Sequence, residues 1–196
     1  MTPKFYVNHG RRCAQAVMRS FCPEKSWKDL DELTGRRKED LTLPVQMAYG
    51  FSSLNIPFIY PVTEGFFEQD LEKVKEQFKS FGEHNFLGIN FDFVNRARKK
   101  LADAGKYVLE REIDWRRIQE ALKKRLTPIL LINYDLLVER EDKQRGHYLT
   151  LVGIEGGNAI VMDCGPCDAS PNRKIPQKKL ERYVMQTPLD LGVIFV

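Results

Sequence analysis

GHYLTLVGIEGGNAIVMD, the stretch over residues 146–163, decides the fold of this chain. Apolar residues dominate both sides of Gly156-Gly157, which predicts two antiparallel strands joined by a glycine-containing turn. His147 opens the first strand and Asp163 closes the second. A histidine and a carboxylate are the residue types of a general base and of the group that orients it, so this hairpin is a candidate site.

The register of the hairpin decides whether His147 and Asp163 share a face of the sheet. A five-residue loop over 153–157 places His147 directly opposite Asp163. A tight two-residue turn at 156–157 shifts the register by one residue and moves the two side chains to opposite faces. We therefore expect a loop of odd length, or a β-bulge. The alternative is a solvent-facing histidine at a strand edge and an aspartate that begins a loop.

The composition is that of a folded globular domain. The chain has 196 residues, of which 42% are hydrophobic and 30% charged, with a formal net charge of +4. Basic and acidic residues are interspersed, so we expect no nucleic-acid partner. No apolar run approaches the ~20 residues that span a bilayer, so we expect no membrane partner. The N-terminus lacks the apolar stretch of a secretory signal, which favours a cytoplasmic protein, and no feature specifies an oligomeric state.

The predicted elements are mostly helices in the first half and strands in the second. Apolar spacing and capping residues predict helices that begin near residues 13, 26, 44, 65, 91 and 114. Strands are predicted at 107–109 and 129–134, and the second opens with four consecutive apolar residues, so both of its faces should be covered. A loop over 164–174 precedes a helix at 176–185 and a strand at 192–196. This order predicts a single α+β domain over 1–196 with one antiparallel sheet.

Cys13 is the candidate nucleophile. It lies at the predicted start of the most apolar helix in the N-terminal half, where the helix dipole and free N–H groups favour a thiolate. Arg11 and Arg12 add positive charge, and a protonated His147 would stabilise the thiolate most. The alternative is that Cys13 is a small apolar residue of a buried helix, a description that fits Cys22 better.

A cysteine at the start of a buried N-terminal helix, followed much later by His-Tyr-Leu-Thr-Leu-Val-Gly, a turn and a strand ending in Asp, resembles the papain-like cysteine peptidases. Within that superfamily the pattern is similar to the double-glycine (bacteriocin) leader peptidases. The resemblance implies a helical lobe over about 1–105, with the nucleophile helix packed on an antiparallel sheet over about 106–196. It further implies a thiol protease with a Cys13, His147 and Asp163 triad, a thioester intermediate, a peptide or other amide substrate, and no cofactor.

Two positions depart from the pattern of that family. Ala14 follows the cysteine where the family usually has glycine, and no glutamine precedes Cys13 to complete an oxyanion hole. Asn8 is the nearest upstream amide and the candidate donor beside the backbone N–H of Cys13. The loss of one oxyanion donor typically costs ~10²–10³ in rate. An acyltransferase and an inactive binding relative therefore remain alternatives to a hydrolase.

Cys164-Gly165-Pro166-Cys167 has the letters of the thioredoxin redox motif. In thioredoxin the first cysteine begins a helix early in the chain, whereas here the motif follows a hairpin and a predicted loop follows it. A reversible disulfide between Cys164 and Cys167, beside Asp163, stays an alternative. With Cys13 and Cys22 there are four thiols for a zinc site, but only Cys164 and Cys167 have metal-ligand spacing, so no metal is predicted.

Overall fold

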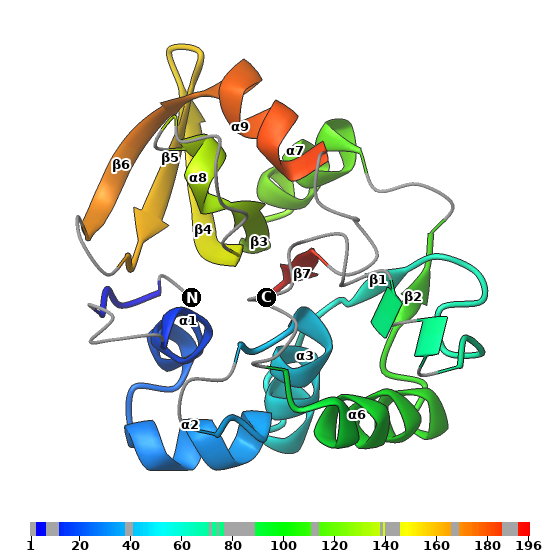
Figure 1. Ribbon diagram of the computed structural model, residues 1–196. Coiled ribbons are helices and arrows are strands. Elements are labelled where there is room, and N and C mark those ends of the chain that lie inside the picture. The colour runs from blue at the N-terminus through cyan, green and yellow to red at the C-terminus, as the bar shows by residue number, and fades with distance from the viewer. Residues whose placement is uncertain are drawn as a thin grey trace.

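The structure is a computed structural model, and it describes residues 3–6, 12–37, 41–70, 72–73, 75–76, 89–110, 114–137, 139, 146–165, 169–185 and 192–196. Helices form one side of the molecule and a five-stranded antiparallel sheet the other (Figure 1). The helices of the first half are α1 (Cys13–Phe21), α2 (Trp27–Thr34), α3 (Pro44–Ser53) and α6 (Phe91–Asp103). The predicted α+β class with an N-terminal helical half is thus confirmed.

The sheet has the strand order β6-β5-β4-β3-β7. Its strands are β3 (Pro128–Asn133), β4 (Gly146–Glu155), β5 (Asn158–Asp163), β6 (Ser170–Pro176) and β7 (Val193–Phe195). Around it lie α7 (Trp115–Lys123), α8 (Tyr134–Leu137) and α9 (Gln177–Met185), and β1 (Pro61–Val62) pairs in parallel with β2 (Val108–Leu109). The C-terminal strand β7 therefore closes one edge of the sheet beside β3.

The sheet separates two hydrophobic clusters, and β3 contributes to both. Ile129 packs with the helices α1, α3 and α6, whereas Leu130 packs with α7 and α9 on the opposite face. Both side chains are at most 1% exposed. The prediction that this strand is covered on both faces is confirmed, and the burial of alternate residues on two sides explains its continuous apolar run.

The predicted helix that begins at Gly65 is wrong at its start. Residues 64–69 form turns, and much of the remaining predicted span lies outside the described residues. The buried guanidinium of Arg98 on α6 donates to the carbonyls of Phe66 and Gln69, at 2.5 and 2.8 Å. These two carbonyls thus accept hydrogen bonds from a side chain of α6. This tertiary contact, and not the local apolar spacing, decides the conformation of residues 64–69.

The predicted loop over 164–174 is also wrong in its second half, because β6 begins at Ser170. The backbone of β6 pairs with β5 from Ser170 opposite Asp163 to Pro176 opposite Asn158. The polar composition of this segment resembles a loop, but the free edge of β5 supplies a partner for its N–H and C=O groups. Strand pairing in a sheet outweighs such weak local preferences.

Candidate active site

Helix α1 places Cys13 at its first residue. The helix is buried on several sides, including Ala14, Val17 and Met18, so packing fixes its position. Arg12 immediately precedes it and forms an ion pair with Asp31 of α2, with Nη2 3.0 Å from Oδ2. No side chain among the described residues caps the N-terminus of α1. An α-helix leaves its first N–H groups without partners inside the helix, which places partial positive charge beside Cys13, and Cys13 itself is only half-buried.

A β-bulge places His147 and Asp163 on the same face of the sheet. The turn at Gly156-Gly157 is tight, with Glu155 paired with Asn158, and the register shifts between Leu151 and Gly153. Of the two expected alternatives, the structure has the β-bulge and not the five-residue loop, and Val152 is the extra residue that returns His147 and Asp163 to one face. Beyond the bulge Asp163 lies opposite Leu149, not opposite His147. His147 is two residues from Leu149 along β4, so its side chain points to the same face as Asp163.

The structure brings the three predicted residues together in one row. Cys13 Sγ lies 3.4 Å from His147 Nδ1, and His147 Nε2 lies 2.6 Å from Asp163 Oδ1. His147 is 4% exposed and Asp163 is fully buried. The imidazole therefore bridges the sulfur of the helical half and the carboxylate of the sheet.

Two further groups hold the Asp163 carboxylate. The backbone N–H of Gly165 donates to Oδ1 at 2.8 Å, and Arg173 Nε of β6 forms an ion pair with Oδ2 at 2.9 Å. Burial disfavours the charged carboxylate, but the hydrogen bond and charge of His147, followed by Gly165 and Arg173, keep the pKa of Asp163 below its ordinary value of 3.8. Asp163 is therefore an ionised acceptor at neutral pH.

The environment of His147 favours its imidazolium form. Burial lowers the pKa of His147, but the charge of Cys13, the hydrogen bond to Asp163 and that to Cys13 outweigh burial and raise this pKa from 6.5 to about 10. A ring that bonds sulfur through Nδ1 and carboxylate through Nε2 carries both protons when charged. The site is thus suited to an ion pair between a thiolate and an imidazolium.

The other predicted residues of the site are placed only in part. Asn8 and Cys167 lie outside the described residues. Cys164 is fully buried with a free thiol, and burial followed by the nearby charges of Cys13 and Asp163 raises the pKa of this thiol. Cys22 is buried as well, and burial raises its pKa to about 11. Both thiols are poor nucleophiles beside Cys13, because the thiolate is the reactive form.

Gly165 is a residue of the site that the sequence prediction missed. The sequence assigns it no role beyond its place in Cys-Gly-Pro-Cys, whereas in the structure its N–H donates to the carboxylate of Asp163. A Cβ at this position would lie 2.8 Å from Asp163 Oδ1 and 3.6 Å from His147 Cε1. The position two residues after the aspartate was the available signal, since such a backbone N–H commonly bonds an Asp side chain.

Replacing Gly165 with alanine is expected to displace the Asp163 carboxylate, because a Cβ 2.8 Å from Oδ1 is closer than van der Waals contact allows. We expect a loss of about 1–3 kcal/mol in the free energy of unfolding, together with slower alkylation of Cys13. Urea unfolding and alkylation rates check this. Gly153→Ala is the matched control, because nothing lies within 4 Å of a Cβ there. Equal behaviour of the two variants would contradict the role given to Gly165.

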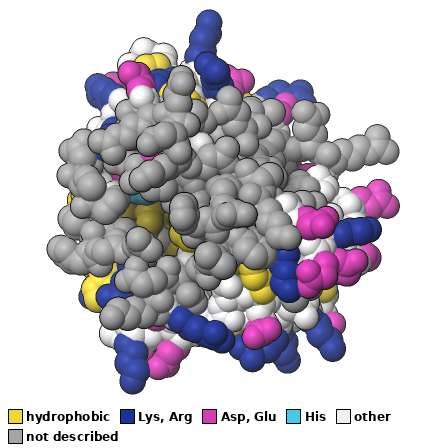
Figure 2. Space-filling view, in the orientation of Figure 1, with side chains coloured by type: hydrophobic (Ala, Val, Ile, Leu, Met, Phe, Trp, Pro, Cys, Tyr) yellow, Lys and Arg dark blue, Asp and Glu magenta, His cyan; other side chains and the backbone are white. Residues whose placement is uncertain are grey.

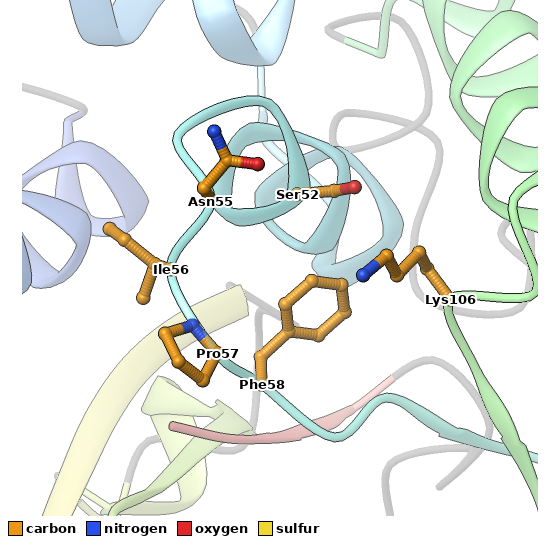
Figure 3. Close-up of a pocket in the computed structure, with 6 residues that line it drawn as sticks. All are labelled: Ser52, Asn55, Ile56, Pro57, Phe58 and Lys106. Atoms are coloured by element: carbon orange, nitrogen blue, oxygen red, sulfur yellow. The ribbon is translucent and has the colours of Figure 1, made fainter.

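A separate pocket of about 370 Å³ lies at the C-terminal end of α3. Figure 3 shows the side chain of Lys106 pointing toward the ring of Phe58 across this pocket. Its lining residues are Ser52, Asn55, Ile56, Pro57, Phe58 and Lys106. Lys106 and Asn55 are exposed, and the lining includes none of Cys13, His147 and Asp163, so the pocket is distinct from the candidate site.

The described surface is mixed in charge. Figure 2 shows acidic and basic side chains interspersed on the described part of one face. No group of three or more His, Cys, Asp or Glu within the described ranges is arranged to hold a metal ion. In the part of the chain that the structure describes, every helix is too short or too polar to cross a membrane.

No protein-family model matches this chain, and no curated protein matches it. The structure is similar to a crystal structure from Bacillus anthracis described as a "putative C39-like peptidase". The two chains are 16% identical, with a TM-score of 0.36, and the match covers 56% of this chain and 60% of the other. A likeness this partial carries no argument about activity, which has to come from the site.

Proposed function

We propose that this chain is a cysteine-dependent hydrolase of peptide or other amide bonds. The observation that carries the proposal is the row of contacts from Cys13 Sγ to His147 Nδ1 at 3.4 Å and from His147 Nε2 to Asp163 Oδ1 at 2.6 Å. A nucleophile, a base and an orienting carboxylate in this geometry are the parts of a catalytic triad. Their order along the chain is that of the papain-like peptidases that the sequence resembles.

The first step is attack of the thiolate of Cys13 on the carbonyl carbon of the substrate. The carbonyl oxygen takes up the negative charge, and the N-terminus of α1 supports its stabilisation, with the N–H of Cys13 as first donor. The imidazolium of His147 then gives its Nδ1 proton to the leaving nitrogen. The C–N bond breaks, the amine leaves, and a thioester with Cys13 remains.

The second step is hydrolysis of the thioester. Neutral His147 accepts a proton from water as the water oxygen attacks the thioester carbon, and the C–S bond breaks to release the acid. Asp163 stays ionised throughout, because Gly165 and Arg173 hold its two oxygens. Its function is to keep the ring oriented with Nδ1 facing the sulfur and to stabilise the imidazolium between steps.

A binding protein on the same fold explains the site less well. Such a protein needs no contact between His147 and Asp163, whereas these residues share a buried hydrogen bond of 2.6 Å. Burying an imidazole and a carboxylate costs free energy unless they are paired, and an apolar pair would pack there at lower cost. A buried series of polar contacts that ends on a half-exposed thiol is better explained by catalysis than by packing of the core.

Alkylation by iodoacetamide tests the proposal. Cys13 is expected to react first between about pH 6 and 7, because it is half-buried and lies 3.4 Å from His147, whereas buried Cys22 and Cys164 react slowly. Peptide mapping by mass spectrometry after short exposures identifies the modified residue. In the Cys13→Ser variant the fast phase of alkylation should disappear. If it persists in this variant, Cys167 and not Cys13 is the fast-reacting thiol. Slow and equal modification of all four cysteines would show that Cys13 is no activated nucleophile.

A further inference from the structure

A closed ring of buried contacts joins the helix of Cys13 to the strand of His147. On one side Gln15, two residues after Cys13 on α1, donates from Nε2 to Thr42 Oγ1 at 2.8 Å. On the other side Tyr148, the residue after His147, donates from its hydroxyl to the carbonyl of Thr42 at 2.8 Å. Thr42 thus bonds both elements, one through its side chain and one through its backbone.

The ring closes at the sulfur of Cys13. The β4–β5 ladder ends at the pair of Leu149 and Asp163, so Tyr148 has no partner from β5 among the described residues. Its N–H and C=O instead both lie 3.3 Å from Cys13 Sγ. The N–H can bond a thiolate and the C=O can accept from a thiol, so the backbone of Tyr148 faces either state of the sulfur.

Burial makes these contacts effective in fixing positions. Gln15 is 1%, Tyr148 4% and Thr42 7% exposed, so water does not replace a lost hydrogen bond. Gln15 Nε2 also bonds Thr34 Oγ1 at 2.9 Å, which ties the ring to the end of α2. Hydrogen bonds within a core restrict the arrangement of the groups they join more strictly than apolar packing does, because each bond has a direction.

We propose that Gln15, Thr42 and Tyr148 are positioning residues that set the distance between the Cys13 sulfur and the His147 ring. The inference rests on the proposed function for the roles of Cys13 and His147, and it adds residues outside the triad. None of the three touches the reacting atoms through its side chain. They act by holding α1 against β4, where a shift of about 1 Å can cost on the order of 10² in rate.

Tyr148→Phe tests the proposal, because it removes only the hydroxyl that bonds Thr42. We expect the folded variant to alkylate Cys13 roughly five- to tenfold more slowly, the effect of one lost hydrogen bond on a positional equilibrium. The pKa of His147 should fall, and hydrogen exchange at the amide of residue 148 should become faster. Tyr183→Phe is the matched control, since Tyr183 is a buried tyrosine of the cluster on the other face of the sheet.

Thr42→Val provides a second variant that removes the other bond of the ring. Wild-type amide exchange at residue 148 and wild-type alkylation in both variants would overturn the proposal. Equal slowing in Tyr183→Phe would also overturn it, since the effect would then reflect general destabilisation. Failure of the proposed function is distinct from either result, because it appears as slow Cys13 alkylation in the unmodified protein. Amide exchange at residue 148 still decides whether the ring holds in that case.

Discussion

Replacing His147 with glutamine is expected to lower the rate of amide hydrolysis by about 10²–10⁴, the usual contribution of a general acid and base. The glutamine amide can still bond Asp163, but it can neither take up the thiol proton nor protonate the leaving amine. The variant should fold, because Asp163 keeps the N–H of Gly165 and the ion pair with Arg173. The loss would therefore report on proton transfer and not on packing.

Hydrolysis of a pooled library of peptides with C-terminal coumarin amides measures this effect, and alkylation of Cys13 at pH 7 measures it without a substrate. Cys13→Ser sets the background for both assays. His147→Ala, which also removes the bond to Asp163, separates the orienting contact from the proton transfer. Hydrolysis by the glutamine variant within about twofold of the unmodified protein, with Cys13→Ser inactive, would mean that another group is the base.

Replacing Asp163 with asparagine is expected to lower the pKa of His147 from about 10 toward 6.5, because the hydrogen-bonded negative charge is one of the causes of the elevated value. In the proposed mechanism the imidazolium protonates the leaving amine, so the rate is expected to fall when His147 loses its proton. In the unmodified protein this alkaline decline should come near pH 10, and in the variant it should come at lower pH. NMR titration of the histidine rings measures the pKa directly.

The same substitution should change stability in a defined pH window. Asp163 has a lowered pKa in the folded chain, so its contribution is present above about pH 3.8 and is lost on further acidification. His147 has a raised pKa, so its contribution is complete below 6.5 and is lost as the pH rises through about 10. The free energy of unfolding should therefore differ most between the two proteins from about pH 4 to 6.5.

Denaturant unfolding across that range checks the window, and His147→Gln assigns the ring signal among the three histidines of the chain. Arg173→Gln is the control, because it removes the partner of Oδ2 and leaves the bond between Oδ1 and His147. It should move the pKa of His147 less than Asp163→Asn does. A pKa of His147 that is the same in Asp163→Asn and in the unmodified protein would contradict the orienting role of the carboxylate.

The sequence was most informative where residue type and local pattern agree. Cys13 at the start of an apolar helix, and the order of helices before strands, were predicted and are observed. Local pattern failed at residues 64–69, where Arg98 of a distant helix takes the carbonyls, and at β6, where β5 supplies the pairing. In both places the deciding contact lies outside the segment itself, on α6 in one case and on the neighbouring strand β5 in the other, and apolar spacing within the segment does not indicate it.

Of the candidate site, the sequence by itself determined the chemical groups, a thiol, an imidazole and a carboxylate, and the elements that carry them. Only the tertiary structure decided that His147 and Asp163 share a face, because one extra residue, Val152, reverses the parity of a strand without any distinctive composition. The tertiary structure also revealed the ring through Thr42 and Tyr148, since hydrogen bonds between residues remote in sequence depend on packing that single residues do not encode.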